Sequence, residues 1–67
     1  MIYVKVEYTD FLDAKHLFDW AKYNNMHIQP RGVKTNVLWV KQQDYTEAFK
    51  ELLLESSLKG VNIEIIK

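Results

Sequence analysis

The sequence predicts a two-layer α+β domain in which one face of a β-sheet is covered by two helices. Two kinds of periodicity support this prediction. Apolar residues alternate with polar ones near both ends of the chain, and they recur every three or four residues in two segments between. A chain of 67 residues is long enough for one small domain, so we expect residues 1–67 to share a single hydrophobic core.

A strand and then a helix are predicted first. Apolar and polar residues alternate over residues 2–8, which is the period of a strand with one buried face. Asp10 can then cap a helix over residues 11–24. Asn24 and Asn25 suit its end, because asparagine tolerates left-handed backbone. The apolar residues at helical spacing, which we expect to face the core, are Phe11, Ala14, Leu17, Phe18 and Ala21.

Two further strands and a turn are predicted in the middle of the chain. Residues 26–29 have the character of a short strand that Pro30 stops, since proline suits a sheet edge better than a sheet interior. Residues 31–35 supply the turn, and a strand follows over residues 36–41. Residues 37–40 are apolar without a break, which predicts either a central strand covered on both faces or a sheet with one exposed apolar face.

A second helix and a last strand complete the chain. Asp44 and Glu47 form a capping-box pattern, and Gly60 can close the helix. The apolar residues at helical spacing, which define the core face of this helix, are Tyr45, Ala48, Phe49, Leu52 and Leu53. Alternation over residues 61–65 predicts the final strand.

The predicted element order is therefore β-α-β-β-α-β. Right-handed crossovers arrange such a chain as a four-stranded antiparallel sheet with two helices on one face, which is the ferredoxin-like fold. If the short strand at residues 26–30 does not form, the alternative is a three-stranded sheet with the same two helices.

Composition and charge exclude several classes of protein. Nine basic and nine acidic residues give a net charge of zero, which disfavours nucleic-acid binding driven by phosphate charge. The chain has no cysteine, so disulfides and thiolate metal sites are excluded. No apolar run is long enough to cross a membrane and no signal sequence opens the chain, so we expect a soluble, cytoplasmic protein.

No residue pattern predicts catalysis, a cofactor or a metal site. His16 and His27 fit no metal-ligand spacing and are best explained as surface residues, although a histidine pair can act as acid and base in RNA cleavage. Asp10 and Asp13 are explained by the start of a helix. The serines at 56–57 lack a neighbouring base, and the isolated glycines form no phosphate-binding loop. We therefore expect a protein that is not an enzyme.

The chain carries more apolar and aromatic surface than its core needs. The side of the first predicted helix that lies opposite its core face is aromatic and apolar, whereas a solvated helix face is usually charged. The far face of the sheet is also apolar, and a two-layer fold has nothing to cover it. Aromatic residues are enriched at protein interfaces. The residues expected to contact a partner are Leu12, His16, Trp20, Tyr23, Trp39 and Tyr3.

A second interpretation of these residues is structural. Trp20 lies at the shoulder of the helical wheel, where it can belong to the core. Leu12 and Tyr23 would then be single exposed apolar residues of the kind that every protein surface carries.

Two segments of the chain resemble the Dmd antitoxins that phages encode. The matching positions are residues 2–6 and the pattern made by Val37, Leu38, Trp39, Tyr45, Glu47, Lys50 and Leu52. The intervening segment is longer here than in that family, and the spacing between the tryptophan and the tyrosine differs by one. The resemblance implies a small α/β protein that neutralises a host ribonuclease toxin by direct binding without catalysis. It also implies that Trp39 contacts the toxin.

The sequence therefore favours a non-enzymatic protein-binding inhibitor or modulator, such as a phage counter-defence or antitoxin-like factor. Its expected partner is a specific host protein, a toxin or a defence protein, met in the host cytoplasm. Two alternatives stay open. One is a homodimeric structural or interaction module, and the other is a ferredoxin-like RNA-binding domain that stacks bases on Tyr3 and Trp39.

Overall fold

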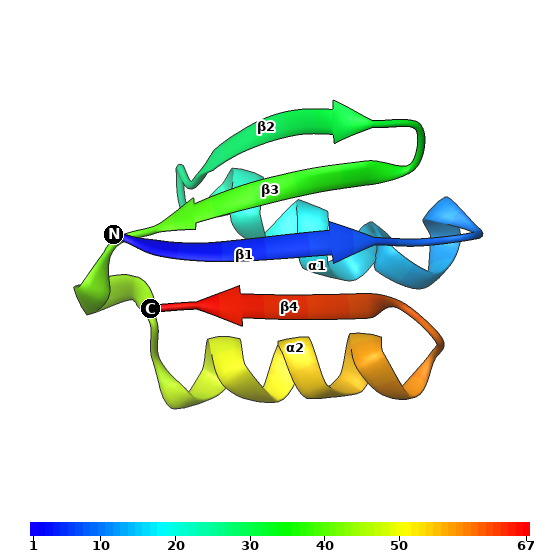
Figure 1. Ribbon diagram of the computed structural model, residues 1–67. Coiled ribbons are helices and arrows are strands. Elements are labelled where there is room, and N and C mark those ends of the chain that lie inside the picture. The colour runs from blue at the N-terminus through cyan, green and yellow to red at the C-terminus, as the bar shows by residue number, and fades with distance from the viewer.

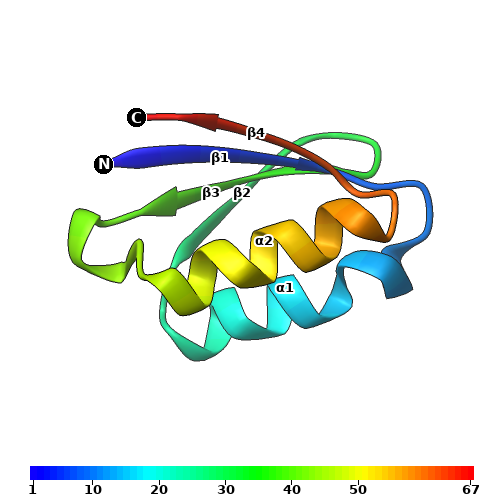
Figure 2. The ribbon, with the colours of Figure 1, turned by 90° about the horizontal axis from the view of Figure 1, so that it is seen from below.

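The computed structural model describes residues 1–67 and has the predicted order of elements (Figure 1). These elements are β1 (Ile2–Glu7), α1 (Phe11–Tyr23), β2 (His27–Gly32), β3 (Thr35–Val40), the 3₁₀ turn η1 (Gln42–Asp44), α2 (Glu47–Leu58) and β4 (Asn62–Ile66). The strands form one antiparallel sheet in the order β2-β3-β1-β4. Both helices cover the same face (Figure 2), so the ferredoxin-like prediction is confirmed and the three-stranded alternative is wrong.

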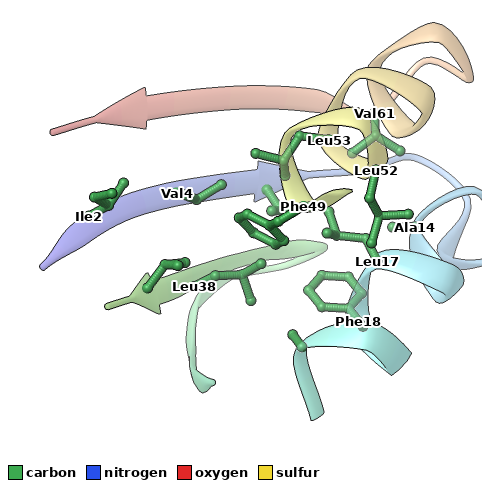
Figure 3. Packing of buried hydrophobic residues seen from close by; sticks show 13 residues of the cluster. Ile2, Val4, Ala14, Leu17, Phe18, Leu38, Phe49, Leu52, Leu53 and Val61 are labelled. Atoms are coloured by element: carbon green, nitrogen blue, oxygen red, sulfur yellow. The ribbon is translucent and has the colours of Figure 1, made fainter. Parts of the chain in front are cut away.

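Strand alternation gives the sheet a helix-facing side and an open side. The register places Val4 of β1 opposite Leu38 of β3, and both side chains are buried in the core cluster. Leu17 of α1 and Phe49 of α2 are the largest of the fully buried side chains. Figure 3 shows Phe49 between α2 and the sheet, so this ring fills the middle of the single core.

The helix α1 begins and ends as its sequence predicts. The Asp10 carboxylate accepts a hydrogen bond from the Leu12 backbone N–H at 3.1 Å, and Asn25 adopts a left-handed φ of 57°. The expectation that Phe11 faces the core is wrong, because this residue is 44% exposed. Its ring lies at the start of the helix and stacks on Phe18 with ring centroids 5.8 Å apart, so it covers the core from outside.

Pro30 does not stop the second strand, contrary to the prediction. The Tyr8 N–H donates to the Lys34 carbonyl at 3.0 Å, and these residues are opposite in the β1–β3 register. Because antiparallel hydrogen-bonded pairs alternate, the even-numbered residues of β3 bond to β1 and the odd-numbered ones bond to β2. Pro30 pairs with Asn36, an even-numbered residue, so its missing N–H falls on the outer side of an edge strand.

The start of α2 lies two residues later than the capping-box pattern predicts. The N-cap is Thr46, whose hydroxyl accepts from the Phe49 N–H at 3.2 Å. Asp44 instead ends the 3₁₀ turn, and Tyr45 precedes the helix, although its ring still packs against the core cluster. The other end agrees with the prediction, since Gly60 closes the helix with a φ of 97°.

We expect Thr46→Ala to lower the free energy of unfolding by about 1 kcal/mol, because it removes the hydroxyl that satisfies the Phe49 N–H. Asp44→Ala is the matched control, and its effect is expected to stay within about 0.5 kcal/mol. Urea unfolding followed by circular dichroism measures both values. An equal loss in both variants would contradict this assignment of the cap.

Candidate functional site

The open side of the sheet carries a row of side chains that crosses all its strands. Tyr3 of β1 is opposite Trp39 of β3, and these two residues are in turn opposite Ile66 of β4 and His27 of β2. The Tyr3 and Trp39 rings meet edge to face, with centroids 5.2 Å apart and planes at 83°. We call Ile66, Tyr3, Trp39 and His27 the aromatic row.

The aromatic row is braced by its neighbours. The Trp39 indole Nε1 donates a hydrogen bond to the Gln29 side-chain oxygen at 3.0 Å. Val37 shares this side of the sheet and is fully buried, although no helix covers it and it lies outside the main core cluster. Half-buried Lys5 and Gln29 lie opposite it on the neighbouring strands. The two rings are therefore held on a packed layer of side chains.

The charges of β1 and β4 on the open side nearly balance, with a slight acidic excess. Lys5 is opposite Glu64, and the Asn62 amide donates to the Glu7 carboxylate at 3.2 Å. A shallow polar hollow of about 300 Å³ lies beside these residues. β1 and β4 thus present one lysine and two glutamates on this side, and Arg31 lies at the register shift of β2.

The residues predicted on the outer face of α1 differ in how far the structure exposes them. Leu12, His16 and Tyr23 are exposed, Leu12 at 72% and Tyr23 at 88%. Trp20 is half-buried and packs against the core cluster. This agrees with the structural interpretation of Trp20 as a shoulder residue.

A surface ion pair lies on the same helix. Lys15 Nζ lies 2.6 Å from Asp19 Oδ2, and this hydrogen bond holds the pKa of the Asp19 carboxyl below its ordinary value. Since both side chains are exposed, the pair contributes little to folding.

The six predicted contact residues do not form one surface. Tyr3 and Trp39 lie together on the open side of the sheet, while both helices lie on the other side (Figure 2). The exposed residues of α1 point away from the sheet, because the opposite face of that helix is buried against the core. A flat partner surface can therefore contact the aromatic row or the outer face of α1, but not both.

One surface was not predicted from the sequence. A groove of about 260 Å³ runs between α2 and β4. Its lining residues are Tyr45, Lys50, Leu53, Leu54, Ser57, Ile63 and Ile65. The exposed position of Leu54 on the helical wheel is the one signal in the sequence that points to it.

Chemistry-bearing side chains are scattered over the molecule. No group of three or more histidine, aspartate or glutamate side chains gathers where a metal ion could bind. None of the helices has the length and apolar character needed to span a bilayer.

Comparisons with protein-family models, with curated proteins and with solved structures found no significant match.

Proposed function

We propose that this chain is a non-enzymatic protein-binding domain that inhibits or modulates a partner by direct contact, as an antitoxin-like or phage counter-defence factor would. The observation that supports this proposal is the braced Tyr3–Trp39 pair on the open side of the sheet. Tryptophan and tyrosine are the residues most enriched at binding hot spots. Side chains that are already ordered lose less conformational entropy on binding, so this pair is a suitable anchor.

The charges around the aromatic row favour a protein partner over a nucleic acid. Two rings on the central strands of such a sheet are also the arrangement that stacks RNA bases. Phosphate binding, however, needs clustered lysine and arginine, and on the open side β1 and β4 carry Lys5 beside two glutamates. RNA binding is therefore the second candidate. If it occurs, anisotropy measurements with single-stranded RNA should show it at low salt.

Trp39→Ala is expected to weaken partner binding at least tenfold, as truncation of an anchor residue does. The partner is first recovered on the immobilised protein from an extract of the native host and then purified. Titration calorimetry measures the affinity, and the partner's own activity is assayed with and without the chain. We expect that activity to change when wild-type protein is added.

Tyr23→Ala is the control, since it removes an aromatic side chain from the opposite side of the molecule, where Tyr23 is 88% exposed while Trp39 is half-buried. It is expected to bind with wild-type affinity, and both variants should keep their far-ultraviolet circular dichroism. Loss of binding in Tyr23→Ala with retention in Trp39→Ala would assign the contact to α1 instead. If light scattering shows that the protein is a dimer, and the dimer forms through the aromatic row, the homodimeric alternative is favoured.

A further inference from the structure

The two edges of the sheet differ in how they are protected against pairing with another strand. The β2 edge contains Pro30, and its register shifts between Pro30 and Gly32. Proline and irregular register are devices that block addition of a further strand. The β4 edge, Asn62–Ile66, has neither a proline nor a register shift. Its backbone is regular and available for pairing.

The ladder pattern shows which backbone groups of β4 are free. Even-numbered residues of β1 bond to β3, so its odd-numbered residues bond to β4. Tyr3 and Lys5 are opposite Ile66 and Glu64, so even-numbered residues of β4 are those bonded to β1. The N–H and C=O groups of Ile63 and Ile65 therefore point away from the sheet.

The groove beside this edge is apolar and open. Ile65 is opposite fully buried Val4 on the helix-facing side, yet it is 39% exposed. In Figure 1, α2 lies beyond β4, on the outer side of the edge strand. A strand added to β4 would therefore rest on α2, where Leu54 and Leu58 are exposed at 61% and 80%.

One end of the groove is cationic. The Nζ atoms of Lys50 and Lys67 lie 5.0 and 5.1 Å from the centre of the Tyr45 ring. Glu47 contacts Lys50 at 3.3 Å, but the Glu47 side chain is almost fully exposed, so this pair is weak. Positive charge therefore remains for an acidic group on a partner.

The charged and apolar residues follow the same order on the two elements that line the groove, β4 and α2. Along β4 and the residue that follows it, residues two apart share a side, in the order Lys67, Ile65, Ile63. On α2, residues four apart share a side, in the order Lys50, Leu54, Leu58. The chain turns back at Gly60, so α2 and β4 run in opposite directions and the two lysines lie at the same end.

We propose that the β4 edge binds an extended peptide segment of another protein, antiparallel to β4, by adding it to the sheet as a fifth strand. The segment carries an acidic residue followed by aliphatic residues two and four positions later. The acidic side chain lies beside Lys50 and Lys67, and the aliphatic side chains enter the groove between Ile65 and Leu54. This site uses the outer edge and the helix-facing side of β4, whereas Ile66 joins the aromatic row on the open side, and the proposal does not depend on the function proposed for that row.

The test uses the peptide acetyl-Thr-Glu-Thr-Val-Thr-Val-Thr-amide and isotope-labelled full-length protein. We expect its addition to shift the backbone amide resonances of residues 50–58 and 62–67 and to leave those of β2 unchanged. The Trp39→Ala protein should bind this peptide like wild type, which separates the result from the test of the aromatic row.

A charge exchange tests the proposed orientation. Lys50→Glu should weaken binding of the glutamate peptide about fivefold and strengthen binding of the same peptide with lysine in place of glutamate. Lys22→Glu on α1 makes the same change in net charge away from the groove and should leave both affinities unchanged. Equal effects of the two variants would overturn the proposal.

A backbone variant tests strand addition itself. Ile65→Pro removes an outward-facing N–H while keeping the ladder to β1, so the sheet resonances should persist and peptide binding should be lost. Unchanged binding in this variant would overturn the proposal, as would the absence of shifts in β4 at saturating peptide. If the free protein forms dimers and Ile65→Pro dissociates them, the proposal is also overturned, because a second copy of the chain would then occupy the edge.

Discussion

Replacing Phe49 with alanine is expected to remove a large part of the protein's free energy of unfolding. The ring is fully buried between α2 and the sheet, and removing a buried phenylalanine costs about 3–5 kcal/mol. At roughly 0.05–0.15 kcal/mol per residue, a domain of this length has a total stability of only about 3–10 kcal/mol. One truncated side chain can thus remove most of the stability.

Phe11→Ala is the control for this substitution, because it deletes the same atoms from a half-exposed position. Its ring contacts Phe18 and Tyr8 on the outside of the core, so we expect a loss of about 1 kcal/mol. Thermal and urea unfolding of both variants measure the difference. Equal losses would mean that Phe49 is not the centre of the core.

The second large effect is expected from Ala14→Leu on α1. Ala14 is fully buried, and Figure 3 shows it on α1 near Leu17 and facing Leu52 of α2. A leucine there has no free volume to occupy, so it must push the helices apart at a cost of about 2–3 kcal/mol.

Ala48 of α2 is exposed, so its expected place on the core face is wrong, and it provides the control for added volume. Ala48→Leu makes the same chemical change at an exposed position, and alanine and leucine have similar helix propensities. It is therefore expected to alter the free energy of unfolding by less than about 0.5 kcal/mol. If Ala14→Leu proves as stable as Ala48→Leu, the contact between α1 and α2 is looser than the structure indicates.

Apolar patterning was enough to predict both helices and all four strands, even though β2 and β4 contain no fully buried residue. It was less reliable for the exact residue at which an element starts or stops, because that depends on the neighbouring turns and strands. Asp44 and Thr46 both have suitable capping groups, and the 3₁₀ turn at Gln42–Asp44 decides between them. Pro30 is tolerated because of the phase of the hydrogen-bond ladder, which cannot be known before the register is known.

The candidate surfaces were predictable to different degrees. Alternation along β1 and β3 places Tyr3 and Trp39 on the open side, since a strand has a fixed period of two. The groove between α2 and β4 depends on how far the helix lies beyond the sheet edge, which no pattern within one element encodes. Trp20 falls between the two cases, because a shoulder position on a helix can be covered or exposed by its neighbours.

The central position of β1 also has a consequence for synthesis on the ribosome. Both of its partners in the sheet, β3 and β4, come from the second half of the chain. At translation rates of about 5–20 residues per second, β1 waits roughly 2–7 seconds before the last residue of β3 is made. During that time its alternating apolar residues have no strand to pair with. Pairing of β1 therefore follows the synthesis of β3, and the sheet is complete only once the final strand has been made.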